Sequence, residues 1–159
     1  MTYEDLERLL EDGETERVDF KIECPALDSG NPDSETGKAE LAKDVCAMAN
    51  NRDGASFLII GVADNGRDFK SVTNAGLTDE NLQTFLKEAV SPPPRVKLVS
   101  VELPASSGQH ACKRCVVIQI GPHSKHAFRL NRDFVSPHNS TTKTRYHFRT
   151  NDVWISDLE

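Results

Sequence analysis

The sequence predicts a single α+β domain, in which a mixed β-sheet packs against about three helices. Apolar residues recur at helical spacing in three segments, and strand-like apolar segments lie between and after them. No linker or internal repeat divides the 159 residues, a length that suits one domain with one sizeable core. We place the domain at residues 1–157, because Leu158 and Glu159 have the look of a cloning scar.

The N-terminal third is expected to hold one helix, one strand and one loop. Thr2 can cap a helix whose apolar face is Leu6, Leu9 and Leu10, and Gly13 ends it. Residues 17–22 alternate apolar and polar side chains, which predicts a half-buried strand. Residues 23–37 are rich in Pro, Gly, Ser and Asp and are expected to form a loop.

The middle of the chain is expected to alternate helix, strand and helix. Apolar residues share one face of a helix over 38–50. Residues 56–62 are almost wholly apolar, which predicts a central strand buried on both faces. Thr78 is expected to cap a third helix over 79–90, which Pro92 and the two prolines after it bring to an end.

The C-terminal part is expected to complete the sheet. Residues 96–103 and 115–120 have the pattern of two hairpin strands joined by a turn at 106–108. Shorter strands are expected near 127–130 and 146–149.

Composition excludes several classes of protein. Hydrophobic residues make up 37% and charged residues 28%, which is typical of a globular protein rather than a disordered one. No apolar run approaches the roughly 18 residues of a membrane span, so no membrane partner is expected. The acidic N-terminus is not a signal or transit peptide. Four cysteines without a dense framework predict reduced thiols in a cytoplasmic protein.

The net charge of −6 is distributed unevenly along the chain. Residues 1–109 carry a balance of −10, whereas residues 110–159 carry +4 and all five histidines. A basic face of this kind can meet phosphates, although two solvated faces explain the same split.

Three acidic residues stand out by their position. Glu14 precedes the first expected strand, Asp19 lies within it, and Asp64 follows the buried strand. Carboxylates at the ends of neighbouring strands can converge on a hard divalent cation, Mg²⁺ or Mn²⁺, which activates water and neutralises charge on a phosphodiester. The alternative is a solvated acidic face, because the first 35 residues contain twelve acids.

Two segments carry a family resemblance: GETERVDFK at 13–21 and ELAKDVCAMANNRDGASFLIIGVADNG at 40–66. They resemble the ordered motifs of the Schlafen AlbA-type DNA-binding domain family, which are E-S-x-x-x-E-F-K, a helix ending in A-x-A-N-x-x-G-G, and a strand reading I-G-V-D-D-x-G. The resemblance continues through V-x-I-x-I at 116–120 and Y-x-F-R at 146–149, so that it covers nearly the whole chain.

The resemblance implies an α+β domain that binds nucleic acid, often as the N-terminal module of a transcriptional regulator. Some relatives are endoribonucleases that cut structured RNA with a three-carboxylate, metal-dependent centre. By motif, the three acids of that centre match Glu14, Asp19 and Asp64. The chain departs from the pattern with Asp in place of Glu at 19, with Ala63 in place of an acid, and with a long loop at 23–37.

A second candidate site pairs cysteines with histidines. Cys112 and Cys115, followed by His123 and His126, offer the sulfur and imidazole ligands that suit Zn²⁺. Only seven residues separate the two pairs, which is short for a zinc finger. The alternative is a hairpin that carries two free thiols.

A third candidate site is the basic C-terminal segment. Its arginines and lysine can contact phosphates, and neighbouring aromatic residues can stack on bases or belong to the core. We expect the contact surface to include Lys125, Arg129, Arg145 and Arg149.

Four functions remain open from the sequence. The leading one is a nucleic-acid-binding domain, and the next is a metal-dependent endoribonuclease acting on structured RNA. A zinc-stabilised interaction module follows, and then a nucleotide-binding (ATP) domain, although residues 61–66 lack the phosphate-loop pattern with its Lys. The sequence does not decide the oligomeric state, and a homodimer stays open.

Overall fold

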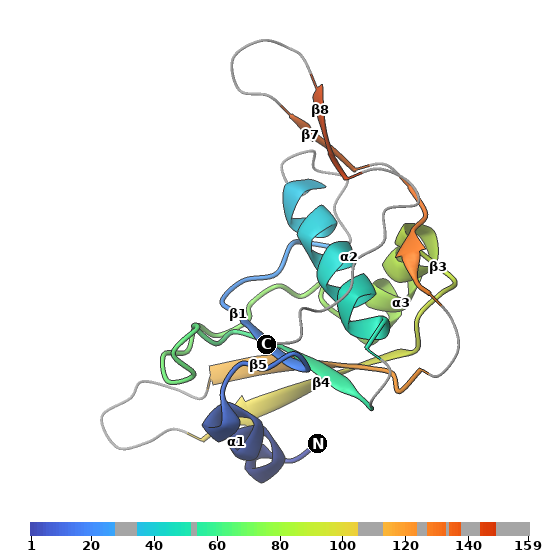
Figure 1. Cartoon of the computed structure of the whole chain (residues 1–159). Helices are drawn as coiled ribbons and strands as arrows, with labels where there is room; N and C mark the ends of the chain where they lie inside the picture. Colours follow the sequence, from blue (N-terminus) through green and yellow to red (C-terminus); the bar gives the residue numbers. More distant parts are fainter. Residues whose placement is uncertain are drawn as a thin grey trace.

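The computed structural model describes residues 1–27, 35–51, 54–104, 113–123, 127–132, 134–137 and 144–148, the residues after Phe134 by their backbone alone. Its elements follow one another in an α+β order (Figure 1). The helices are α1 (Tyr3–Asp12), α2 (Glu35–Ala49) and α3 (Asp79–Ala89). The strands are β1 (Val18–Lys21), β2 (Ser56–Ile60), β3 (Val90–Ser91), β4 (Val96–Leu103), β5 (Lys113–Ile120), β6 (Arg129–Leu130), β7 (Phe134–Pro137) and β8 (Thr144–Phe148).

The main sheet is mixed, as the sequence predicts. Its strand order is β1-β2-β5-β4. β1 runs parallel to β2, whereas β2 with β5 and β4 with β5 are antiparallel. The pairs β3–β6 and β7–β8 form two small additional sheets. The apolar strand β2 is therefore central, and β1 occupies one edge of the main sheet.

Helices cover the two faces of this sheet unequally. Alternate side chains of a strand point to opposite faces, and the core accordingly divides into two clusters. α2 and α3 pack on one face, where Leu58 and Ile60 of β2 lie. α1 packs on the other face through Leu6, against Phe20 and Ile59 (Figure 1). In the part of the chain that the structure describes, no helix is long and apolar enough to cross a membrane.

Local chemistry explains where the helices begin and end. The Thr2 side chain accepts a hydrogen bond from the Asp5 N–H, and Asp5 in turn accepts from the Thr2 N–H, so α1 begins with a capping box. Gly13, with a φ of 74°, ends that helix. Thr78 caps α3 in the same way by accepting from the Asn81 N–H. The predicted starts of these two helices are confirmed.

Several predicted boundaries are wrong by a few residues. α2 begins at Glu35 rather than at 38, and Glu35 forms an ion pair with Arg132 that no local pattern reveals. β2 ends at Ile60 rather than at 62, because Gly61 turns the chain with a φ of 98°. The short strands β3 and β7 were not predicted, since each pairs with a segment distant in sequence.

Asn50 connects the end of α2 to the chain 78 residues later. Its Oδ1 accepts a hydrogen bond from the Phe128 N–H at 2.7 Å, and its Nδ2 donates to the Phe128 carbonyl at 3.0 Å. Phe128 itself is buried beside α2 and α3. Asn50 therefore fixes the position of β6 relative to α2.

Replacing Asn50 by Ala is expected to destabilise the domain by about 1–3 kcal/mol, because the buried Phe128 N–H loses its Asn50 acceptor and the Phe128 carbonyl keeps only the weaker Cys46 Sγ donor. Urea unfolding followed by circular dichroism measures this as a lower midpoint with an unchanged slope. Asn50→Asp keeps the acceptor and loses the donor, so its midpoint should fall between the two. An Asn50→Ala midpoint equal to that of the wild type would contradict this role.

Candidate functional site

Glu14 lies along the outer edge of β1. A tight turn connects Thr15 to Val18, whose N–H and carbonyl groups bond each other in both directions at 2.9 and 3.3 Å. This turn folds the chain back, so that Glu14 comes beside Asp19, five residues later. The Glu14 carboxylate then accepts a hydrogen bond from the Phe20 N–H at 3.0 Å. This hydrogen bond satisfies one of the backbone N–H groups on the open edge of the sheet.

The Glu14 carboxyl group has a raised pKa. Burial is the largest cause, and it outweighs the hydrogen bond from the Phe20 N–H, which lowers the pKa. Asp19 raises the pKa further by a side-chain hydrogen bond and by its charge, and the charge of Asp64 adds to this. Glu14 and Asp19 are therefore in hydrogen-bond contact, and Asp64 lies close enough for its charge to act on Glu14.

Asp64 reaches this place on a compact turn after β2. The Lys70 N–H donates to the Gly61 carbonyl, and Val62 forms a β-bridge with Phe69, so the chain returns on itself. A Cβ on Gly66 would lie 3.3 Å from both the Leu10 carbonyl and the Phe20 ring. The turn thus packs closely against the C-terminal end of α1 and against β1, and it holds the exposed Asp64 near Glu14.

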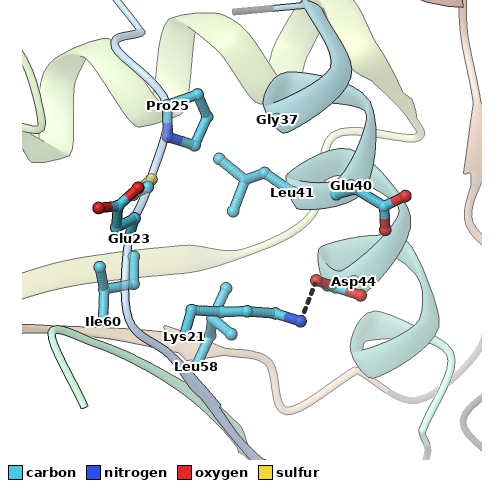
Figure 2. Close-up of a pocket in the computed structure, with 10 residues that line it drawn as sticks. Lys21, Glu23, Pro25, Gly37, Glu40, Leu41, Asp44, Leu58 and Ile60 are labelled. Atoms are coloured by element: carbon cyan, nitrogen blue, oxygen red, sulfur yellow. Dashed lines mark ion pairs between the residues drawn. The ribbon is translucent and has the colours of Figure 1, made fainter. Parts of the chain in front are cut away.

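Lys21 joins these acids to a further carboxylate on α2. Its Nζ lies 3.2 Å from Asp19 Oδ2 and 3.3 Å from Asp44 Oδ2. Figure 2 shows the Lys21 side chain extending from β1 toward Asp44. Neither residue is a predicted site residue. Lys21 belongs to the E-F-K motif, whereas nothing in the local sequence of α2 distinguishes Asp44 from its other polar residues.

The Lys21–Asp44 pair is held in a partly desolvated place. Burial lowers the pKa of Lys21, but the charges of Asp44 and Asp19 together outweigh it, so that the pKa is raised. Burial also raises the pKa of Asp44, and the opposing charge of Lys21 does not fully offset it. Burial dominates at Asp44, whose side chain is only 17% exposed, and it is outweighed at Lys21, whose side chain is 41% exposed. The raised pKa values therefore favour the charged form of Lys21 and disfavour the charged form of Asp44.

Of the predicted zinc ligands, the structure describes Cys115 and His123 and places these two apart. Cys115 lies near the start of β5, buried on the α1 side of the sheet, where burial raises the pKa of its thiol to about 11. His123 follows the other end of that strand, accepts a hydrogen bond from the Arg95 N–H, and packs its ring on Phe128. The strand rise alone separates Cys115 from the end of β5 by about 17 Å. Cys112 and His126 lie outside the described residues.

The predicted basic surface can be placed only in part. Arg129 is exposed on β6, next to Phe128. Cys46 Sγ and Asn50 Nδ2 both donate to the Phe128 carbonyl. Cys46 lies on the side of α2 opposite to Asp44, since the two residues are about 200° apart on the helix. Lys125 and Arg149 lie outside the described residues, and Arg145 is described by its backbone alone. Arg129 and the carboxylates are thus on opposite sides of α2.

The three carboxylates suit a hard cation in their chemistry. Asp and Glu oxygens are the ligands that Mg²⁺ and Mn²⁺ prefer, and the charges of Asp19 and Asp64 act on Glu14, although burial is the larger cause of its raised pKa. Within the described residues, no three acidic, histidine or cysteine side chains already form a metal-holding group. A cation would therefore have to draw the exposed Asp64 toward the Glu14–Asp19 pair.

The comparison with protein families decides the relationship that these motifs suggest. Residues 14–153 match the Schlafen, AlbA_2 family, which is most of the chain. The chain belongs to the Schlafen, AlbA_2 family. The match begins at Glu14, so the Schlafen, AlbA_2 segment includes all three carboxylates, Lys21 and Asp44. Membership suggests a nucleic-acid-binding domain. No curated protein matches the sequence.

Replacing Asp19 by Asn is expected to lower the pKa of Glu14 more than replacing Asp64 by Asn, because Asp19 acts by a hydrogen bond and by charge, whereas Asp64 acts by charge alone. A carboxyl-detected NMR titration measures both effects. Glu80→Gln, at an exposed position of α3, is the control and should leave Glu14 unchanged.

A raised carboxyl pKa also means that the folded state binds the proton more tightly than the unfolded state. Stability should therefore fall as the pH rises from the ordinary Glu value through the raised one, and Glu14→Gln should remove this fall. A Glu14 pKa that Asp19→Asn leaves unchanged would contradict the arrangement.

Proposed function

We propose that this domain binds nucleic acid, and that Glu14, Asp19 and Asp64 hold a divalent cation, Mg²⁺ or Mn²⁺, against a backbone phosphate. The observation that carries the proposal is the contact between Glu14 and Asp19, with Lys21 paired to Asp19 and with Asp64 near enough for its charge to act on Glu14. Phosphates are repelled by carboxylates, so an acidic site meets nucleic acid through a cation. Family membership supports the same class of ligand.

The basic C-terminal segment supplies the electrostatic part of this proposal. Arg129 is exposed, and we include Lys125, Arg145 and Arg149 in the same surface because of their sequence pattern. We further propose that the domain acts in the cytoplasm as a module of a transcriptional regulator or related protein. Among the described residues, Cys24, Cys46 and Cys115 form no disulfide with one another, in keeping with the reducing compartment that we propose.

Replacing Arg129 by Ala is expected to weaken oligonucleotide binding and to reduce the slope of log affinity against log salt by about one unit, because one phosphate contact is lost. Fluorescence anisotropy at several salt concentrations measures the slope. Arg8→Ala is the matched control, since Arg8 is equally exposed but lies on α1, on the other face of the sheet. Equal slopes for Arg129→Ala and the wild type would remove Arg129 from the surface.

A second candidate function is metal-dependent endoribonuclease activity on structured RNA. The three converging carboxylates favour it, because a cation held there would activate a water and neutralise charge on the phosphodiester. In this arrangement Glu14 and Asp19 would orient the cation from β1, and Lys21 would compensate charge on Asp19.

For this candidate, transfer RNA should be cleaved in Mn²⁺ and left intact in chelator. Asp64→Asn should lower the rate by orders of magnitude with RNA affinity largely kept, since other residues supply the binding. Gel electrophoresis and anisotropy measure the two quantities, and Glu80→Gln serves as the control. Cleavage that persists in chelator and in Asp64→Asn comes from a contaminant, and intact RNA in every metal leaves binding alone.

A further inference from the structure

A cavity of about 410 Å³ lies between the end of β1 and α2, directly beside the Lys21–Asp44 pair (Figure 2). This volume is in the range of small-molecule pockets. The described residues that line it are Lys21, Glu23, Cys24, Pro25, Gly37, Glu40, Leu41, Asp44, Leu58 and Ile60. A Cβ on Gly37 would lie 3.0 Å from Pro25, so the absence of a side chain at Gly37 lets Pro25 approach α2 closely at this end.

The walls of the cavity combine an apolar surface with one polar pair. Leu58 and Ile60 of the central strand and Leu41 of α2 are buried core residues, and they give the cavity its apolar part. The polar part comes from Lys21, a donor, and from Asp44, an acceptor held next to it. With three carboxylates and one ammonium in the lining, the cavity repels anions and favours a group that presents hydrogen-bond donors.

Lys21 lies between the cavity and the acidic cluster formed by Glu14, Asp19 and Asp64. A single nitrogen is within ion-pair distance of both Asp19, of the acidic cluster, and Asp44, of the cavity. The Asp19 and Lys21 side chains lie two residues apart on β1 and therefore project to the same face. In a nucleotide, one sugar separates the base from the phosphate. A phosphate at the acidic cluster would thus bring the adjoining base to the mouth of the cavity.

We propose that this cavity takes an unpaired guanine base of a nucleic-acid strand whose phosphate lies at Glu14, Asp19 and Asp64. On its Watson–Crick edge guanine places the O6 acceptor next to two donors, N1–H and the N2 amino group. Lys21 donates to O6, and the two oxygens of Asp44 accept from the two donors. No other common base offers two adjacent donors to a carboxylate. The apolar walls formed by Leu41, Leu58 and Ile60 contact the ring faces.

This inference rests on the proposed function for the strand, but the base alone can be tested separately. In protein with labelled Ile and Leu methyl groups, guanosine should shift the NMR signals of Leu41, Leu58 and Ile60. Inosine keeps O6 and N1–H but lacks the N2 amino group, and it should bind about tenfold more weakly. Asp44→Asn should bind guanosine no better than inosine, whereas Glu80→Gln should keep the wild-type ratio. The wild-type comparison of the two nucleosides needs no variant and is independent of any effect of Asp44→Asn on folding.

The strand is tested with a short uridine oligonucleotide and the same oligonucleotide containing one guanosine, in Mg²⁺. We expect the second to bind about tenfold more tightly in the wild type and equally tightly in Asp44→Asn. If guanosine and inosine bind equally, or if the methyl shifts occur only outside the cavity, the inference is overturned. Oligonucleotide binding would then still support the proposed function. If guanosine binds but neither oligonucleotide does, the proposed function fails, and with it the assignment of the base to a strand.

Discussion

The parallel pairing of β1 with β2 is the constraint on which the candidate site depends. The register runs from Val18 opposite Phe57 to Lys21 opposite Ile60, so both strands end at the same side of the sheet. Because the side-chain period of a strand is two, this register directs Phe20 to the α1 face and Lys21 to the α2 face. A slip by one residue would exchange these faces and separate the charged cluster from α2. The site is therefore a consequence of the sheet's register.

The open edge of β1 is the second part of this constraint. An edge strand exposes unpaired N–H groups, and here the Glu14 carboxylate accepts from one of them. The same contact holds Glu14 beside Asp19, where burial and, to a smaller extent, the charges of Asp19 and Asp64 raise its pKa. One side chain thus protects the sheet edge and concentrates negative charge. Lys21 compensates part of that charge, and its position between Asp19 and Asp44 connects the edge to the cavity.

The sequence predicted the features that depend on neighbouring residues. Thr2 and Gly13 bounded α1 correctly because capping is local chemistry, and the alternating pattern placed β4 at 96–103. Family motifs identified Glu14, Asp19 and Asp64, of which the turn at residues 15–18 brings Glu14 beside Asp19. The cavity and the contact between Asn50 and Phe128 could not be predicted, since they join segments far apart in the chain. The local sequence of α2 does not reveal the role of Asp44, because its partner Lys21 lies on β1.

The positions of the charges restrict the kind of ligand that can use the whole domain. The carboxylates and the cavity lie on the Asp44 side of α2, whereas Arg129 follows Phe128, which is bonded to the opposite side of that helix. A mononucleotide at the carboxylates is too short to reach around α2. A ligand that contacts both sides must extend over several nucleotides or carry its own tertiary shape. Under the proposed function, this arrangement favours a long or structured nucleic acid over a free nucleotide, with the proposed base contact on one side of α2 and Arg129 on the other.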